Sequence, residues 1–521
     1  MSLRARFYRS AFYNLFLWGP NPSSLRLILA ETWPGDASRG KHFLNYPPQW
    51  NEADHRFHFL ADLAALAGGA GGRTAREWTS HWLKYCDRVE DLSWRPDVIG
   101  DRLYSWVAFH EMLSSGEEGL SLEPLLAQSL ARQMRHLARV WKRVFGLARL
   151  QALRGLIAAA AAVGDENRLG RAIDALADEC KLQVLADGGH PSRSPEAVLA
   201  ALAYLIEARD ALAAASAEIP AELLSAIDRA APLLRFFLHG DGRLALFNGS
   251  SEIETNFIAQ VLRRSQSTAK PPPRAPHTGY ERLWAGESLT ILDCGAHPPR
   301  PWDGNAHAGC LALEMSVGDE RILVNCGARL EGHDREETES WRIAMRATAA
   351  HSTLIVADTN SAEIDAGGHF AGPPFAVAVK RSGENGDQYL SSSHHGYGAA
   401  FGLVHVREIY LAADGGDLRG EDRLEPAAGL NSAGRGFAIR FHLHPEIQAS
   451  ATSGGSVLLR LKSGAFWRFH AAGAAVNLAE SIYLGTGTLR RSQQVILSGF
   501  AGPEGIAVKW ALRRERGPIA Q

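Results

Sequence analysis

The segment RRSQSTAKPPPRAPHTG, residues 263–279, divides the 521-residue chain into two parts with different patterns of hydrophobic residues. It is basic, polar and rich in proline, so we expect an extended and exposed link. Before it, apolar residues recur every three to four positions, whereas after it they alternate with polar ones. Because these periods are typical of α-helices and of β-strands, the segment marks a change from a helical half to a β half.

The helical half covers residues 55–262. Its clearest helix is PEAVLAALAYLIEARDALAAA (195–215), in which apolar residues stand three and four positions apart. Ser194 is a suitable N-cap for this helix, and Pro195 occupies its first position. Further segments with the same spacing are separated by short Gly/Pro breaks. Serial helical hairpins of this kind form a bundle, a solenoid or a closed toroid, and no fixed-period repeat favours the solenoid.

The β half, residues 280–521, consists of short runs of β-forming residues between clusters of Gly, Asp, Asn and Ser. In AIRFHLHP (438–445), Ile439, Phe441 and Leu443 alternate with Arg440, His442 and His444, which predicts one buried face and one basic, wet face. Many such strands without intervening helices predict a stacked-sheet sandwich. We therefore expect an α+β multidomain chain with four parts: an N-terminal segment (1–54), a helical domain (55–262), the link (263–279) and an antiparallel β-sandwich (280–521).

Composition excludes some classes of partner. The formal net charge of -2 and a pI near 6.9 give no electrostatic reason to expect nucleic acid. No apolar stretch approaches the length of a membrane-spanning helix.

The N-terminal segment is expected to contain a short amphipathic helix at residues 4–18. This helix either packs on the protein's own surface or makes weak membrane contact. Because no signal-peptide cleavage site follows, a cytoplasmic location is favoured, with the periplasm or cell envelope as the alternative.

Three motifs indicate a protein family more specifically than the order of the helical and β halves does. They are DGGHPSRSP (187–195), NAHAGCLALEMSVGDERILVNCGA (305–328) and WRIAMRATAAHSTLIVADTNSAEI (341–364), the last two expected to form or lead into strands. Together they resemble the heparinase II/III family of polysaccharide lyases, from about residue 15 to the C-terminus. The resemblance implies an incomplete (α/α) toroid followed by antiparallel β-sheets. It also implies β-elimination on a uronic-acid glycan, in a cleft where toroid and sandwich meet.

β-Elimination needs a base, an acid and a group that neutralises the sugar carboxylate. The family's D-G-x-x-x-E-x-S segment normally runs on into a tyrosine with the acid/base role and a histidine. Here Asp187, Gly188 and Ser194 match the motif, but Ala197 and Val198 stand where the tyrosine and histidine are expected. The resemblance therefore covers the fold more completely than the chemistry.

The family's strand motif H-x-H-x-D is also only partly matched by this chain. Asn305 replaces its first, catalytic histidine, whereas His307 retains the second. Asn325 stands at the position of a metal-binding aspartate, and the later histidine is kept as His351. His307, His351 and Asn325 could bind zinc, or the two histidines could be hydrogen-bonded within the sandwich edge.

The candidate site residues fall into two further groups. Loop 187–195 could present its histidine and arginine to an anionic sugar, or it could be a structural loop whose arginine caps a helix. Tyr397, next to two histidines, could supply the missing acid or base, or it could pack in a turn. The candidate catalytic residues are His190, Asn305, His351 and Tyr397, and the candidate substrate-binding residues are Arg193, Arg342 and Arg346.

Two functions remain open after this comparison. The first is a polysaccharide lyase with a rewired active site that acts on an acidic polysaccharide or oligosaccharide. The second is a catalytically inactive glycan-binding or scaffolding member of the family. A glycoside hydrolase on the same toroid is a third, weaker hypothesis. No cofactor is expected, apart from zinc at the histidines, and the sequence does not indicate an oligomeric state.

Overall fold

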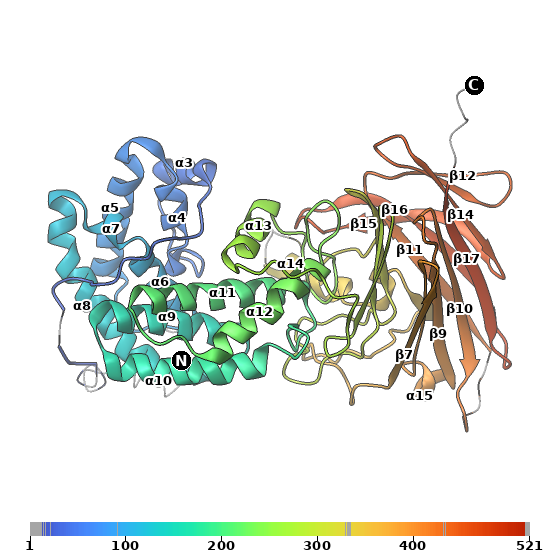
Figure 1. Cartoon of the computed structure of the whole chain (residues 1–521), viewed down its shortest axis with the longest axis horizontal. Helices are drawn as coiled ribbons and strands as arrows, with labels where there is room; N and C mark the ends of the chain where they lie inside the picture. The colour runs from blue at the N-terminus through green and yellow to red at the C-terminus, as the bar shows by residue number, and fades with distance from the viewer. Residues whose placement is uncertain are drawn as a thin grey trace. The chain divides into compact units, whose positions relative to one another are not determined.

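The computed structural model describes residues 13, 15, 17–20, 22–90, 92–328, 330, 335–430, 432 and 434–515. Most of the helix expected over residues 4–18 lies outside the described residues. The chain divides into two compact units: a helical unit, made of Met1–Gln183, Ala200–Asp228 and Arg263–Ser265, and a β unit, made of Val184–Leu199, Arg229–Leu262 and Gln266–Gln521. In Figure 1 the first helices are blue to green, and the strands follow in yellow to red.

The first part of the chain is helical, as its apolar spacing predicts. Glycines allow two of its helices to approach closely: a Cβ on Gly155 of α9 would lie 2.0 Å from the carbonyl oxygen of Gly100 in α6. None of the described helices is long and apolar enough to cross a membrane. The helices of this part are α3 (Ala37–Asn45), α4 (Phe59–Ala64), α5 (Ala70–Tyr85), α6 (Pro96–Ala108), α7 (His110–Ser114), α8 (Gly116–Val140), α9 (Leu147–Val163), α10 (Glu166–Gln183), α11 (Pro195–Ala214), α12 (Ala221–Phe236) and α13 (Thr255–Arg264).

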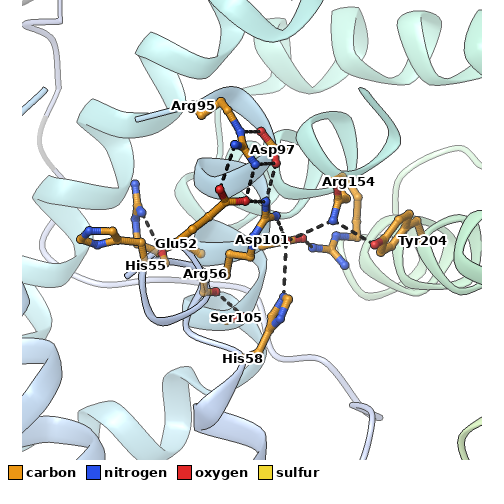
Figure 2. Close-up of polar contacts among 12 residues, drawn as sticks. Glu52, His55, Arg56, His58, Arg95, Asp97, Asp101, Ser105, Arg154 and Tyr204 are labelled. Carbon is orange, nitrogen blue, oxygen red and sulfur yellow. Dashed lines mark hydrogen bonds and ion pairs between the residues drawn. The ribbon is translucent and has the colours of Figure 1, made fainter. Parts of the chain in front are cut away.

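A network of charged side chains lies in the helical unit (Figure 2). Its centre is Asp101 of α6, which is fully buried. Arg154 of α9 donates to its Oδ1, and Oδ2 accepts from Arg56 Nη1 at 2.5 Å and from Gln151 Nε2 at 3.2 Å. His58 lies 3.4 Å from the same oxygen. One buried carboxylate therefore joins two helices to the segment before α4.

The network continues outward from this carboxylate through alternating charges. Arg154 also pairs with Glu207 of α11. Arg56 contacts Asp97 at 2.5 Å and Glu52 at 2.9 Å, and both of these acids also bind Arg95. Burial alone would raise the pKa of Asp101, but Arg154, His58 and Arg56 hold it well below its usual value. Asp101 is therefore charged in the folded protein at neutral pH.

Two antiparallel sheets form the later part of the chain. Their order is β1-β2-β3-β4-β5-β11-β16-β15, with β6 paired to β11, and β12-β13-β14-β17-β10-β9-β8-β7. The strands are β1 (Arg274–Ala275), β2 (Tyr280–Ala285), β3 (Ser288–Asp293), β4 (Leu313–Val317), β5 (Glu320–Val324), β6 (Leu354–Val356), β7 (Val377–Glu384), β8 (Asp387–His394), β9 (Leu403–Leu411), β10 (Asp417–Pro426), β11 (Arg435–Leu443), β12 (Gln448–Ala451), β13 (Val457–Arg460), β14 (Phe466–Ala472), β15 (Ala475–Tyr483), β16 (Arg490–Ala501) and β17 (Ile506–Arg514).

The core between the sheets includes Ile439, Phe441 and Leu443 of β11, as their alternation predicts. The expectation of a wholly wet opposite face is wrong, because His442 is only 2% exposed. Its ring nitrogens contact the Ser481 hydroxyl at 2.8 Å and the Ala349 carbonyl at 3.0 Å. A buried imidazole is tolerated here because both of its nitrogens have hydrogen-bond partners.

Most of the segment before β6 is helical. Residues Arg335–Met345 form α14, and Thr348–Ala350 form a short 3-10 helix. Arg342 lies in the last turn of α14, and Arg346 follows directly after it. Consequently these two arginines project from a helix end and not from alternate positions of a strand.

Candidate functional site

Asn248 contacts two of the candidate residues, Arg193 and His307, within the β unit. Its Nδ2 donates to the Tyr280 hydroxyl at 2.7 Å and to Asp293 Oδ2 at 3.3 Å. Its Oδ1 accepts the backbone N–H of His307 at 3.0 Å. The residue adopts a left-handed conformation (φ 47°) before Gly249, as asparagine does in tight turns. Sequence analysis missed Asn248, although an Asn-Gly pair is the signal that would have marked such a turn.

His307 and His351 contact each other directly, with 3.0 Å between Nδ1 of the first and Nε2 of the second. Nδ1 of His351 lies 2.8 Å from the carbonyl oxygen of Ala347, which only accepts hydrogen bonds. His351 therefore carries its proton on Nδ1, and its Nε2 accepts a hydrogen bond from Nδ1–H of His307. This assignment leaves Nε2 of His307 as a basic nitrogen without a hydrogen-bond partner among the described residues.

Both imidazoles of this pair are neutral at physiological pH. Burial lowers the pKa of His351 to about 4 and that of His307 well below its usual value, and the neighbouring His351 lowers the latter further. A neutral imidazole with one free nitrogen can accept a proton. The pair therefore has the form of a base held in position by a second histidine.

Arg193 does not present its guanidinium to a ligand, which corrects the substrate-binding role expected for it. Its five N–H donors have five protein acceptors: Nε donates to Thr278 at 2.7 Å, and the two Nη atoms bind three more carbonyls and Asp293. The residue is buried and has φ 62°. Because an arginine has only these five donors, none remains for a sugar carboxylate.

His190, three residues before it, is also enclosed. Its Nδ1 lies 2.7 Å from the Ser192 hydroxyl, and its ring meets Trp302 edge to face with 5.2 Å between centroids. Burial lowers the pKa of His190 to about 3. Arg193 lies near Asn248, whose Nδ2 is 3.5 Å from its carbonyl oxygen, and both His190 and Arg193 make structural contacts.

The two arginines at the end of α14 hold the loop that carries Asn305. Arg346 is buried and donates to the carbonyls of Asp303, Ala306 and Gly368 at 2.8–3.0 Å, so its expected role in substrate binding is replaced by a structural one. Arg342 donates to the Gly304 carbonyl at 3.2 Å and pairs with Glu339. Asn305 itself is exposed and lies two residues before His307.

Tyr397 is a core residue, and the expectation that it replaces the family's acid/base tyrosine is wrong. Its ring is 1% exposed, its hydroxyl donates to the Leu354 carbonyl at 2.9 Å, and burial raises its pKa strongly. His394 beside it contacts His405, which pairs with the buried Asp422. This cluster belongs to the interior of the sandwich and has no access to a substrate.

The residues expected to bind zinc do not form a complete site. Asn325 Oδ1 accepts the backbone N–H of Ser352 at 3.0 Å, and its Nδ2 donates to Glu314 at 3.2 Å. Among the described residues, no three His, Cys, Asp or Glu side chains converge on one point. The histidine pair alone lacks the third protein ligand that zinc usually has, and so no step is assigned to a metal.

Residues 267–511 match the family described as "Heparinase II/III-like, C-terminal". FtsZ-localized protein C of Caulobacter vibrioides is 32% identical over 481 residues, which cover 89% of this chain and 81% of that protein. The chain belongs to the heparinase II/III family. The family prediction made from the three sequence motifs is thus confirmed.

Solved structures of the heparinase family share the fold. One heparinase III structure matches with a TM-score of 0.75 and 14% sequence identity, over 97% of this chain and 89% of that one. Heparan sulfate lyase HepC of Pedobacter heparinus matches with a TM-score of 0.63 and 16% identity, over 92% and 79%. These likenesses confirm the expected architecture of a helical toroid followed by antiparallel sheets.

In this chain, the residues at the positions of the family's catalytic tyrosine and the following histidine cannot take over proton transfer. Ala197 and Val198 lie in the first turn of α11 and are 7% and 1% exposed. Tyr280, which does lie near the histidine pair through Asn248, donates its hydroxyl to the Arg193 carbonyl at 2.7 Å, and burial raises its pKa strongly. A buried phenol that is engaged in this way is poorly suited to proton transfer.

We expect Arg193→Ala to lower the free energy of unfolding of the β unit by about 3–5 kcal/mol, because it leaves Asp293 as an uncompensated buried charge. Urea unfolding followed by circular dichroism measures the change. Arg460→Ala is the matched control, since Arg460 is exposed and makes no ion pair among the described residues. A loss below 1 kcal/mol would contradict the structural role of Arg193.

Proposed function

We propose that this chain is a catalytically inactive member of the heparinase II/III family that acts by binding other molecules. One observation carries the proposal: the arginine expected to bind the sugar carboxylate and the tyrosine expected to transfer protons are both engaged in the fold. All five donors of Arg193 have protein acceptors, and the Tyr397 hydroxyl donates to a core carbonyl. The expected partner is a glycan or a protein. The similarity to FtsZ-localized protein C favours a protein partner.

FtsZ-localized protein C supports a role in an assembly. Its name places that relative with FtsZ, and the similarity to it extends over 89% of this chain. None of the contacts that occupy Arg193, Arg346 and Tyr397 would hinder binding through another surface. We therefore infer that this chain is also recruited to FtsZ and serves there as a scaffold.

Two measurements test this function. A fluorescently tagged chain, expressed in Caulobacter vibrioides, is expected to form a band with FtsZ and to disperse when FtsZ is depleted. The purified protein, incubated with alginate, heparan sulfate, hyaluronan or polyglucuronate, is expected to produce no absorbance from unsaturated uronate. A diffuse signal in cells that contain normal FtsZ assemblies would refute the recruitment.

Residual lyase activity is the second candidate, and the geometry of His307 favours it. Its Nε2, which has no hydrogen-bond partner among the described residues, is the one basic nitrogen of the histidine pair, and His307 follows the exposed Asn305 by two residues. If unsaturated uronate does form, His307→Ala should reduce its rate by about 10²–10⁴-fold, as expected for loss of a placed base. Asn477→Ala in β15, which is far from His307 in the sequence, is the control for this substitution. Activity that depends on His307 would overturn the inactive assignment.

A further inference from the structure

A groove on the helical unit contains none of the candidate site residues. Its volume is about 1270 Å³, and it lies between α5 with the turn that follows and α8. The described part of the N-terminal segment contributes Leu17 and Trp18 to its wall. The remaining lining residues are Ser80, Leu83, Lys84, Asp87, Arg88, Val89, Glu90, Leu125, Gln128, Ser129, Arg132 and Arg135.

Large apolar side chains are exposed in this groove. Trp18 is 83% exposed and Leu125 is 57% exposed, although both line a concave surface. Leu83 and Val89 are half-buried beside them. A tryptophan and a leucine that face solvent within one concavity are typical of a binding surface, because burying them on association is favourable.

The charged residues of the groove are predominantly basic, with four cations and two carboxylates. Lys84 and Arg88 are exposed, and neither has a carboxylate partner in the part of the chain that the structure describes. Arg135 donates to the carbonyl oxygens of Leu17 and Pro20, and it forms no ion pair with a carboxylate of the described residues. The groove therefore attracts an acidic ligand.

Two polar side-chain atoms in the wall of the groove are buried without a hydrogen-bond partner among the described residues. Arg132 approaches Asp87 at 3.5 Å, but Nε of the arginine and Oδ1 of the aspartate have no hydrogen-bond partner within the described ranges. One of these atoms is a donor and the other is an acceptor. The wall therefore contains an ion pair whose hydrogen bonds are incomplete.

We propose that this groove binds an acidic, amphipathic segment of a partner protein. Its apolar side chains would contact Trp18 and Leu125, and its carboxylates would pair with Lys84 and Arg88. A membrane surface offers similar chemistry, but a lipid surface is flat, whereas this groove is concave. The inference rests on the proposed function, since it names the surface through which an inactive family member would join an assembly.

Fluorescence anisotropy with synthetic peptides tests the groove. The probe is a fluorescein-labelled 18-residue peptide with leucines on one helical face and glutamates on the other. A second peptide replaces the glutamates with lysines, and a third replaces the leucines with serines. The full-length protein is expected to bind the first at least about tenfold more tightly than either of the others, because both charge and apolar contact contribute.

Variants in the groove locate the binding. Lys84→Glu/Arg88→Glu and Trp18→Ala are each expected to raise the Kd by about tenfold or more, because they remove the complementary charge or the apolar anchor. Both changes affect exposed side chains, so the thermal unfolding temperature should not move. Arg73→Glu is the matched control, since Arg73 is an exposed cation of α5 that does not line the groove.

Several outcomes would overturn the proposal. Equal binding of the acidic and basic peptides, or an unchanged Kd in the groove variants, would exclude this surface. Sedimentation with phosphatidylserine vesicles, together with no binding of the acidic peptide, would assign the surface to lipid instead. If the groove variants still form a band with FtsZ in cells, the groove is refuted while the proposed function stands. If the unmodified chain does not localise, the proposed function itself fails.

Discussion

Asp101→Asn is expected to lower the free energy of unfolding of the helical unit by about 3–5 kcal/mol, because breaking a buried ion-pair network leaves uncompensated charges. Asp101 is 0% exposed and accepts hydrogen bonds from Arg56, Arg154 and Gln151 (Figure 2). Asparagine has a similar shape but no charge, so Glu207 would be the remaining ion-pair partner of Arg154 among the described residues. The loss should appear in urea unfolding monitored by tryptophan fluorescence.

A control separates this effect from a general sensitivity to charge removal. Asp228→Asn in α12 removes an exposed carboxylate that has no ion pair in the described structure, and it should change the stability by less than about 0.5 kcal/mol. The Asp101→Asn protein should still fold at low urea concentration, with native helical content. A loss no greater than that of the control would mean that the network contributes little to stability.

Acidification is expected to destabilise the protein more than any single substitution. Burial lowers the pKa of His136, His190 and His442 to about 3 and that of His351 to about 4. In the unfolded chain each of them titrates near 6.5, so between these values the unfolded state binds more protons. Stability that is fully present above pH 6.5 is therefore lost as the pH falls, by about 2 kcal/mol per histidine at pH 5.

Denaturant unfolding at pH 7, 6 and 5 measures this loss. His190→Asn should reduce it by about 2 kcal/mol, because asparagine can keep the hydrogen bond to Ser192 but does not titrate. His277→Asn, which replaces an exposed histidine, is the matched control. A free energy of unfolding that is constant from pH 7 to pH 5 would be incompatible with neutral, buried histidines in the folded state.

The neighbourhood of the candidate site could be predicted from the sequence, but the roles of its residues could not. The family motifs brought His190, Arg193, His307 and His351 into consideration, and Asn248 connects their loops in the structure. The expected roles differed from the observed ones because the role of a side chain depends on which of its atoms already have hydrogen-bond partners in the fold. Arg193, for example, donates to residues that are 85 to 103 positions away.

The sequence by itself determined the change from helices to strands, the inward face of strands such as β11 and the membership in the heparinase II/III family. These features depend on local periodicity and on short motifs, both of which involve residues that are close together in the sequence. The tertiary structure alone decided that Arg193, Arg346 and Tyr397 are structural and that His307 keeps a free nitrogen. It also brought the apolar and basic side chains of the groove together. Such properties depend on burial and on distant hydrogen-bond partners, and only the folded chain supplies them.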